Sequence, residues 1–98
     1  MPLSRMTTDD ARRKKLKLRA WRRGFREADL ILGPFADRHV SGFSGPELDW
    51  FEALLDQADQ DVYGWILERA PTPPEFDGPL MRRLKAFRDE AYKGVGNG

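Results

Sequence analysis

Residues able to perform covalent or metal chemistry are few in this sequence. It contains one histidine, His39, and no cysteine. A serine nucleophile needs a histidine and a carboxylate beside it, and zinc prefers several histidine or cysteine ligands. One histidine supplies neither arrangement well. We therefore expect no catalytic residue and no metal site, and we interpret His39 as a partly buried member of an apolar helix face.

A second candidate is the segment that starts with Asp59 and continues through Asp61 to Gly64, because it begins like a calcium-binding loop. Its twelfth position is Ala70, where such a loop needs a glutamate that binds through both oxygens. We interpret the two aspartates as caps and favourable charges at the start of a helix. Glycines elsewhere lack the spacing of phosphate-binding loops, so we expect no stably bound cofactor.

Charge is strongly segregated along the chain. Residues 1–26 hold ten basic and two acidic side chains, residues 27–79 hold two and twelve, and residues 80–98 hold five and two. Either these segments pair within the fold or a basic face meets an acidic partner. The basic run at residues 12–19 also raises the alternative of nucleic-acid binding. Because no recognition helix or RNA-stacking sheet accompanies it, we favour a solvated or partner-facing helix.

Apolar residues recur at spacings of three and four in five segments, which is typical of helices. The first helix is predicted from Asp9 or Asp10 to Gly24, with an apolar face led by Leu18 and Trp21 and extended by Leu16 and Ala20. The apolar stripe of the second contains Ala28, Ile31, Leu32, Phe35, Ala36 and His39. Pro34 lies inside this stripe, so we expect a kink, or a break at Gly33-Pro34.

The other three helices are shorter or end at prolines. Ser44, Pro46 and Glu47 predict a capped start for the third helix, whose buried side is Leu48, Phe51, Leu54 and Leu55. The fourth starts after Asp59 or Asp61, carries Val62, Tyr63, Trp65, Ile66 and Leu67, and ends at Pro71, Pro73 and Pro74. The fifth runs from about Pro79 to Tyr92, with Leu80, Leu84, Phe87 and Ala91 on one side.

No segment shows strand alternation, so we predict an all-α fold, a compact five-helix bundle. The chain reads as a single domain over residues 1–98, with an ordered helical core at about 9–92 and flexible termini at 1–8 and 93–98. No signal peptide or membrane-spanning stretch is recognisable, and the absence of cysteine fits a reducing compartment. We therefore expect a cytoplasmic protein without membrane insertion.

The corner between the first two helices combines a glycine with charged neighbours, in the order Arg23-Gly24-Phe25-Arg26-Glu27. Glycine takes the left-handed conformation without steric cost and lets another backbone approach closely. Arg23 and Glu27 can then point outward from one tight corner. The alternative is an ordinary helix end with an incidental arginine and glutamate.

These residues resemble the SdhE-type, or YgfY, family of flavinylation and assembly factors of succinate dehydrogenase. Family members carry an RGxxE motif, present here at Arg23, Gly24 and Glu27. The resemblance covers residues 12–67 and adds a basic helix with Trp, a Pro34-Phe35 pair, a capped acidic third helix and a final Asp61-Val62-Tyr63-Gly64-Trp65 segment. Phe25 and Gly33 depart from the common pattern, and the segment after Arg69 matches poorly.

The resemblance implies an assembly factor without catalytic machinery of its own. It would bind the flavoprotein subunit of succinate dehydrogenase, or of fumarate reductase, and promote covalent attachment of FAD to that subunit before the complex assembles. Arg23, Gly24 and Glu27 would contact the partner, and the surrounding patch would include Arg19, Trp21 and Arg26. Its location would be the bacterial cytoplasm or the mitochondrial matrix. A basic-helix nucleic-acid binder and an antitoxin-like regulator stay as alternatives.

Overall fold

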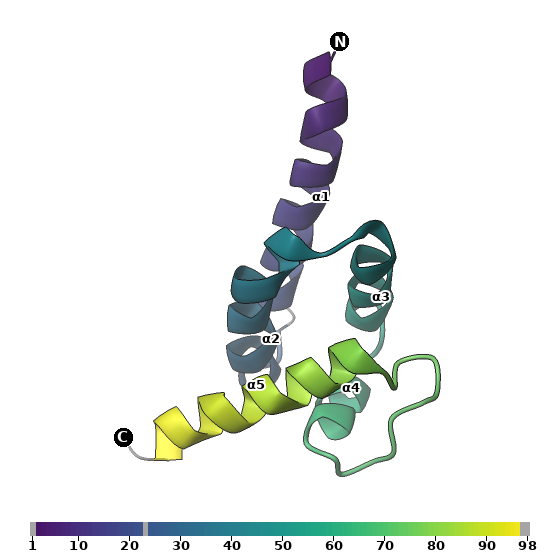
Figure 1. Cartoon of the computed structure of the whole chain (residues 1–98). Coiled ribbons are helices and arrows are strands. Elements are labelled where there is room, and N and C mark those ends of the chain that lie inside the picture. Colours follow the sequence, from purple (N-terminus) through teal and green to yellow (C-terminus); the bar gives the residue numbers. More distant parts are fainter. Residues whose placement is uncertain (1, 23, 97–98) are drawn as a thin grey trace.

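The computed structural model describes the backbone of residues 2–22 and 24–96, and the side chains of residues 10–22 and 24–90. It contains five α-helices and one short 3-10 helix, and the described part of the chain contains no strand, which confirms the all-α prediction (Figure 1). The elements are α1 (Pro2–Trp21), α2 (Arg26–His39), η1 (Val40–Gly42), α3 (Gly45–Leu55), α4 (Asp59–Ile66) and α5 (Pro79–Gly96).

Helix α2 forms the centre of the core. Its predicted stripe is confirmed, since Ala28, Ile31, Leu32, Phe35 and Ala36 are all buried. The ring of Phe35 lies about 6 Å from the rings of Phe43, Phe51 and Phe87, so it joins α2 to α3 and α5. The helix runs unbroken through Pro34, and a break at Gly33-Pro34 is therefore wrong. Burial of apolar side chains on both sides of the proline compensates for the missing backbone hydrogen bond.

Helix α1 differs from the prediction at both its start and its buried face. It begins at Pro2, so Asp9 and Asp10 lie within the helix and do not cap it. Its N-terminal part extends beyond the other helices (Figure 1). Leu16 and Ala20 are buried, whereas Leu18 is 53% exposed. The spacing of four puts Leu16 and Ala20 on one face, and Leu18 lies about 200° around the helix from Leu16.

The predicted capping box of α3 is confirmed. The Ser44 hydroxyl accepts a hydrogen bond from the Glu47 amide at 3.4 Å, and the Glu47 carboxylate accepts one from the Ser44 amide at 2.8 Å. The four residues expected on its buried side are all buried. These two bonds satisfy amide groups that the first turn of a helix leaves without partners.

Helix α4 begins without a side-chain cap, so capping by Asp59 or Asp61 is wrong. The residue before the helix is Ala58, and both aspartates lie in the first turn. Carboxylates at these positions still interact favourably with the positive end of the helix dipole. The helix ends at Ile66, ahead of the prolines, and Glu68 has a φ of 59°.

Helix α5 extends to Gly96, beyond the predicted end at Tyr92. Leu80, Met81 and Leu84 are buried and Phe87 packs against the core, while the Ala91 side chain lies outside the described residues. The connection before α5 also contributes Phe76, which is 5% exposed and stacks on Trp65 with ring centres 5.4 Å apart. The ring of Phe76 also lies 6.3 Å from that of Trp50, so it contacts both α3 and α4.

Ion pairs connect α1 with α3, so the segregated charges pair in part within the fold. Arg12 lies 2.6 Å from Asp49 and 2.9 Å from Glu52, and Arg19 lies 2.7 Å from Asp56. Hydrogen bonds to Asp49 and Glu52 raise the pKa of Arg12 above its ordinary value. The basic run is therefore not a uniform free surface.

Candidate functional site

The connection between α1 and α2, called the junction below, is short, as the sequence predicts. Helix α1 ends at Trp21 and α2 begins at Arg26. Between them Gly24 is exposed and has a φ of 85°, which side chains rarely adopt. A Cβ at this position would meet no described atom within 4 Å. Glycine is therefore required at position 24 by the backbone conformation and not by crowding from neighbouring atoms.

The charged residues of the predicted site begin α2. Arg26 and Glu27 are both exposed, and neither forms an ion pair with another described residue. Glu27 lies in the first turn of the helix, where a negative charge is favoured by the dipole. Arg23 lies outside the described residues. The described part of the junction and the start of α2 thus present a glycine, an exposed cation and an exposed anion.

Phe25 fixes the junction to the rest of the protein. It precedes α2 in an extended conformation and its carbonyl accepts a hydrogen bond from the Asp29 amide at 2.9 Å. Its ring packs against the core and lies 4.9 Å from the ring of Tyr63 in α4. Phe25 was assigned no role from the sequence, although a large apolar residue between a glycine and an arginine is a usable signal for an anchor.

Trp21 is only partly available to a partner. Its ring lies over Gly33 in α2, and its indole nitrogen donates a hydrogen bond to the Asp37 carboxylate at 3.1 Å. The side chain nonetheless remains 40% exposed. Trp21, which the sequence places in the predicted patch, therefore also packs on α2. Neither Gly33 nor Asp37 was identified as part of the site from the sequence.

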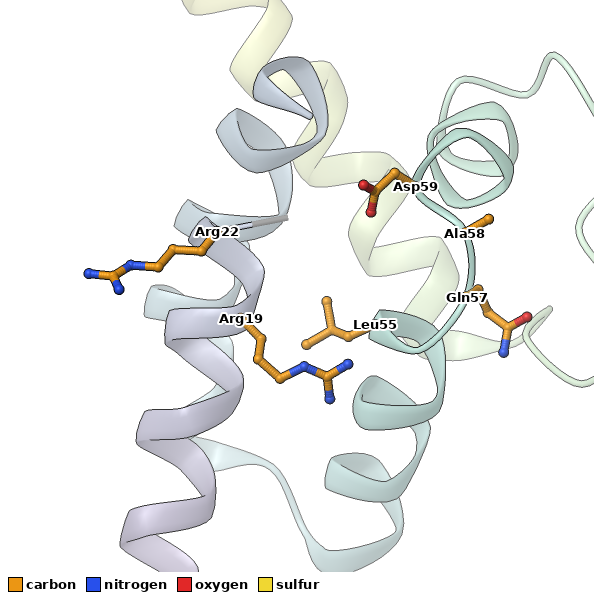
Figure 2. A pocket seen from close by; sticks show the side chains of 6 residues that line it. All are labelled: Arg19, Arg22, Leu55, Gln57, Ala58 and Asp59. Atoms are coloured by element: carbon orange, nitrogen blue, oxygen red, sulfur yellow. The ribbon is translucent and has the colours of Figure 1, made fainter. Parts of the chain in front are cut away.

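Arg19 lies at the edge of the site, where α1 faces the connection between α3 and α4. Figure 2 shows Arg19 extending toward α3, where it pairs with Asp56. A shallow cavity of about 360 Å³ lies here. It is lined by Arg19, Arg22, Leu55, Gln57, Ala58 and Asp59 (Figure 2). Its openness and mixed lining suit a protein contact better than a small ligand.

Apolar side chains accompany the exposed charges. Among the residues whose side chains are described, the exposed large hydrophobic ones are Leu18, Trp21 and Leu30, all on α1 or α2. Leu30 shares a face of α2 with Gly33, and Leu18 shares a face of α1 with Trp21, because both pairs are three residues apart. Exposed aromatic and apolar residues beside arginine are typical of binding surfaces. Leu30 was not predicted as a site residue from the sequence. Its position outside the apolar stripe of its helix is the signal that could have identified it.

The acidic and histidine side chains of the described residues form no group of three or more able to hold a metal ion. His39 is half-buried between Phe35 and Phe87, at ring distances of 4.7 and 6.3 Å, and burial followed by the charges of Arg83 and Arg38 lowers its pKa. Within the described part of the chain, no helix has the length and apolar character needed to cross a bilayer.

Comparison with known proteins identifies similar chains. A family model described as "Flavinator of succinate dehydrogenase" matches residues 14–88. The chain is 42% identical over 85 residues to succinate dehydrogenase assembly factor 2, mitochondrial, of Debaryomyces hansenii, covering 84% of this chain and 58% of the relative. It is 35% identical over 74 residues to the FAD assembly factor SdhE of Acetobacter pasteurianus, covering 76% and 68%.

The matched region extends further than the sequence motifs indicated. They ended at Leu67, whereas the family model continues through the connection to α5 and most of that helix. The chain spans about half to two-thirds of the length of the curated relatives it matches.

Proposed function

Since this chain belongs to the family described as flavinator of succinate dehydrogenase, we propose that it is an assembly factor for the flavoprotein subunit of that enzyme. It binds the subunit before the complex assembles and promotes covalent attachment of FAD. The chain acts as a chaperone-like partner and supplies no catalytic group. Its place of action is the bacterial cytoplasm or the mitochondrial matrix.

The observation that supports this proposal is the exposed junction at Gly24. Its glycine leaves open space on the surface, Arg26 and Glu27 are exposed next to it, and Leu18, Trp21 and Leu30 add apolar area nearby. Arginine and tryptophan are the residue types that contribute most to protein interfaces. We assign contacts with the flavoprotein to Arg23, Gly24 and Glu27, flanked by Arg19, Trp21 and Arg26.

In this proposal FAD is held by the partner, and the chain alone does not bind it stably. The cavity beside Arg19 is open and lined by a mixed set of residues, unlike the enclosed apolar pockets that hold cofactors. Titration of the purified chain with FAD checks this separately from flavinylation. Saturable binding of FAD to the isolated chain would contradict this part of the proposal.

Nucleic-acid binding is not favoured. Two cations of the basic run are paired, Arg12 with carboxylates of α3 and Arg19 with Asp56 directly after that helix. Their charge is therefore largely used within the fold, whereas nucleic-acid binding depends on free cations that displace counterions from phosphates.

The experiment is coexpression with the flavoprotein subunit of succinate dehydrogenase, followed by flavin fluorescence of the denatured subunit in a gel. The chain should increase the covalent flavin, and Gly24→Arg should abolish the increase. Gly42→Arg is the matched control, because Gly42 is also exposed with open space at its Cβ and has no positive φ. Equal fluorescence with and without the chain would reject the proposal. A parallel test with a fumarate reductase flavoprotein establishes which enzyme is served.

A further inference from the structure

The indole of Trp21 occupies the space that a side chain at position 33 would fill. Gly33 is buried. A Cβ built there would stand 2.5 Å from Cε2 and 2.7 Å from Cε3 of the indole, and closer still to Cδ2. Real Cβ atoms do not approach other atoms so closely. Any residue other than glycine at this position must therefore displace the ring or separate α1 from α2.

A hydrogen bond fixes the orientation of the same ring. The indole nitrogen donates to Oδ2 of Asp37 at 3.1 Å. Asp37 lies four residues after Gly33, so both residues belong to one face of α2. The close contact determines how near the ring lies to α2, and the hydrogen bond determines how the ring is rotated.

These contacts lie directly beside the junction. Trp21 is the last residue of α1, and the amide of Arg22 donates to the Arg19 carbonyl at 3.2 Å in a tightened final turn. Gly24 follows in its left-handed conformation. Few rotatable bonds separate the indole from Gly24, so the placement of the ring on α2 restricts the backbone of the junction.

We propose that Trp21, Gly33 and Asp37, the indole clasp, are positioning residues that hold the junction at Gly24 in the conformation a partner protein binds. Gly33 is buried beneath the ring, so a substitution there affects a partner only through Trp21 and the helices it joins. The structural half of this proposal concerns the chain alone. Its effect on partner binding rests on the proposed function.

Amide hydrogen exchange on the isolated chain tests the structural half. Gly33→Ala should accelerate exchange of the Arg22 amide about tenfold and move the Trp21 indole NMR signal, with little change at the Val62 amide of α4, which donates to the Ala58 carbonyl. Gly64→Ala is the matched control, because Gly64 also lies inside a helix, with its nearest Cβ contact at 3.9 Å. An unchanged Arg22 amide and indole signal in folded Gly33→Ala overturns the proposal.

A second pair of variants decides the matter if Gly33→Ala does not fold. Asp37 is exposed, so substitutions there spare the core. Asp37→Ala removes the acceptor of the indole hydrogen bond and should accelerate exchange at Arg22, whereas Asp37→Asn keeps an acceptor oxygen and should preserve most of the protection. Equal exchange in wild type, Asp37→Ala and Asp37→Asn contradicts the clasp.

Affinity for the flavoprotein subunit tests the functional half. Gly33→Ala should weaken binding about tenfold or more, because sites held to a fraction of an ångström lose function when their support moves. In a Trp21→Leu background the same substitution should change affinity less than about twofold, since the clashing ring is gone.

The outcomes separate this inference from the proposed function. Absence of binding by the wild-type chain contradicts the proposed function, while hydrogen exchange still decides the structural half. Binding that is lost in Gly24→Arg but retained in Gly33→Ala, with the indole signal moved, overturns the positioning role alone.

Discussion

The ring of Phe25 packs against the ring of Tyr63 with centres 4.9 Å apart and planes inclined by 44°. This contact joins the junction of α1 and α2 to α4, although the two residues lie far apart in the sequence. The exposed Gly24 is therefore followed at once by an anchored residue. A surface segment that is fixed in this way would lose little conformational entropy on binding a partner.

We expect Phe25→Ala to lower the free energy of unfolding by about 1–2 kcal/mol, less than for a fully buried phenylalanine because the ring is only half-buried. Phe25→Tyr keeps the ring and should stay close to wild type. Urea unfolding measures both. In a double-mutant cycle with Tyr63→Ala, the coupling free energy between the two rings should be about 0.5–1.5 kcal/mol. Strictly additive effects of the two substitutions would show that the ring contact does not contribute to stability.

Gly24→Ala should destabilise the fold by about 1–2 kcal/mol, because a φ of 85° is strained for a residue with a Cβ. Gly24→Asn should cost less, since asparagine tolerates the left-handed region better. Gly42→Ala, at an exposed glycine without a positive φ, should stay within about 0.5 kcal/mol of wild type. Denaturant midpoints compare the three variants. No loss of stability in Gly24→Ala would mean that the junction changes conformation at little cost.

His39 should make stability depend on pH below its ordinary pKa of 6.5. Burial and the nearby Arg83 and Arg38 lower the pKa of His39 in the folded state, only partly opposed by Glu90. The unfolded chain then binds more protons than the folded one, so stability is full above pH 6.5 and falls as the pH drops from there toward the lower folded pKa.

The check for His39 is thermal unfolding between pH 7.5 and 5.5 in wild type and His39→Gln. The variant should lose most of the pH dependence in this interval, because the chain contains no other histidine. Parallel curves for the two proteins would contradict the assignment.

The Arg88 side chain connects α5 to the end of α4. Its guanidinium donates to the Ile66 carbonyl at 2.6 Å and pairs with Glu68 at 3.3 Å and Asp89 at 2.6 Å. The side chain is only 14% exposed. Burial works against its charge, but the hydrogen bonds to Asp89 and Glu68 leave its pKa raised. Charged donors of this kind matter most where they satisfy carbonyl groups at a helix end.

Arg88→Ala should therefore reduce stability by about 2 kcal/mol, because it leaves the Ile66 carbonyl without this donor. Arg88→Lys should recover part of the loss, since lysine keeps the charge but not the forked geometry. Arg82→Ala, a change at an exposed position of the same helix, is the control and should have little effect. A loss in Arg82→Ala as large as in Arg88→Ala would assign the effect to helix propensity.

Local patterns in the sequence determined the five helices, the capping box at Ser44 and the glycine corner, because each depends on residues within a few positions of one another. The apolar stripe of α2 was equally predictable, since its apolar residues recur over several turns and are compatible with only one buried face. In α1 the apolar residues are sparse among basic ones, and Leu18 and Trp21 formed as plausible a face as Leu16 and Ala20. The tertiary structure selected the second pair.

The tertiary structure also decided which side chains meet across the chain. Asp56 lies against Arg19, Tyr63 against Phe25, and Gly33 beneath Trp21, and none of these pairs is close in the sequence. Periodicity shows which face of a helix is buried but carries no information about the distance and angle at which two faces meet. Those quantities depend on the packing of the whole core, so the residues that hold the junction became visible only in the folded chain.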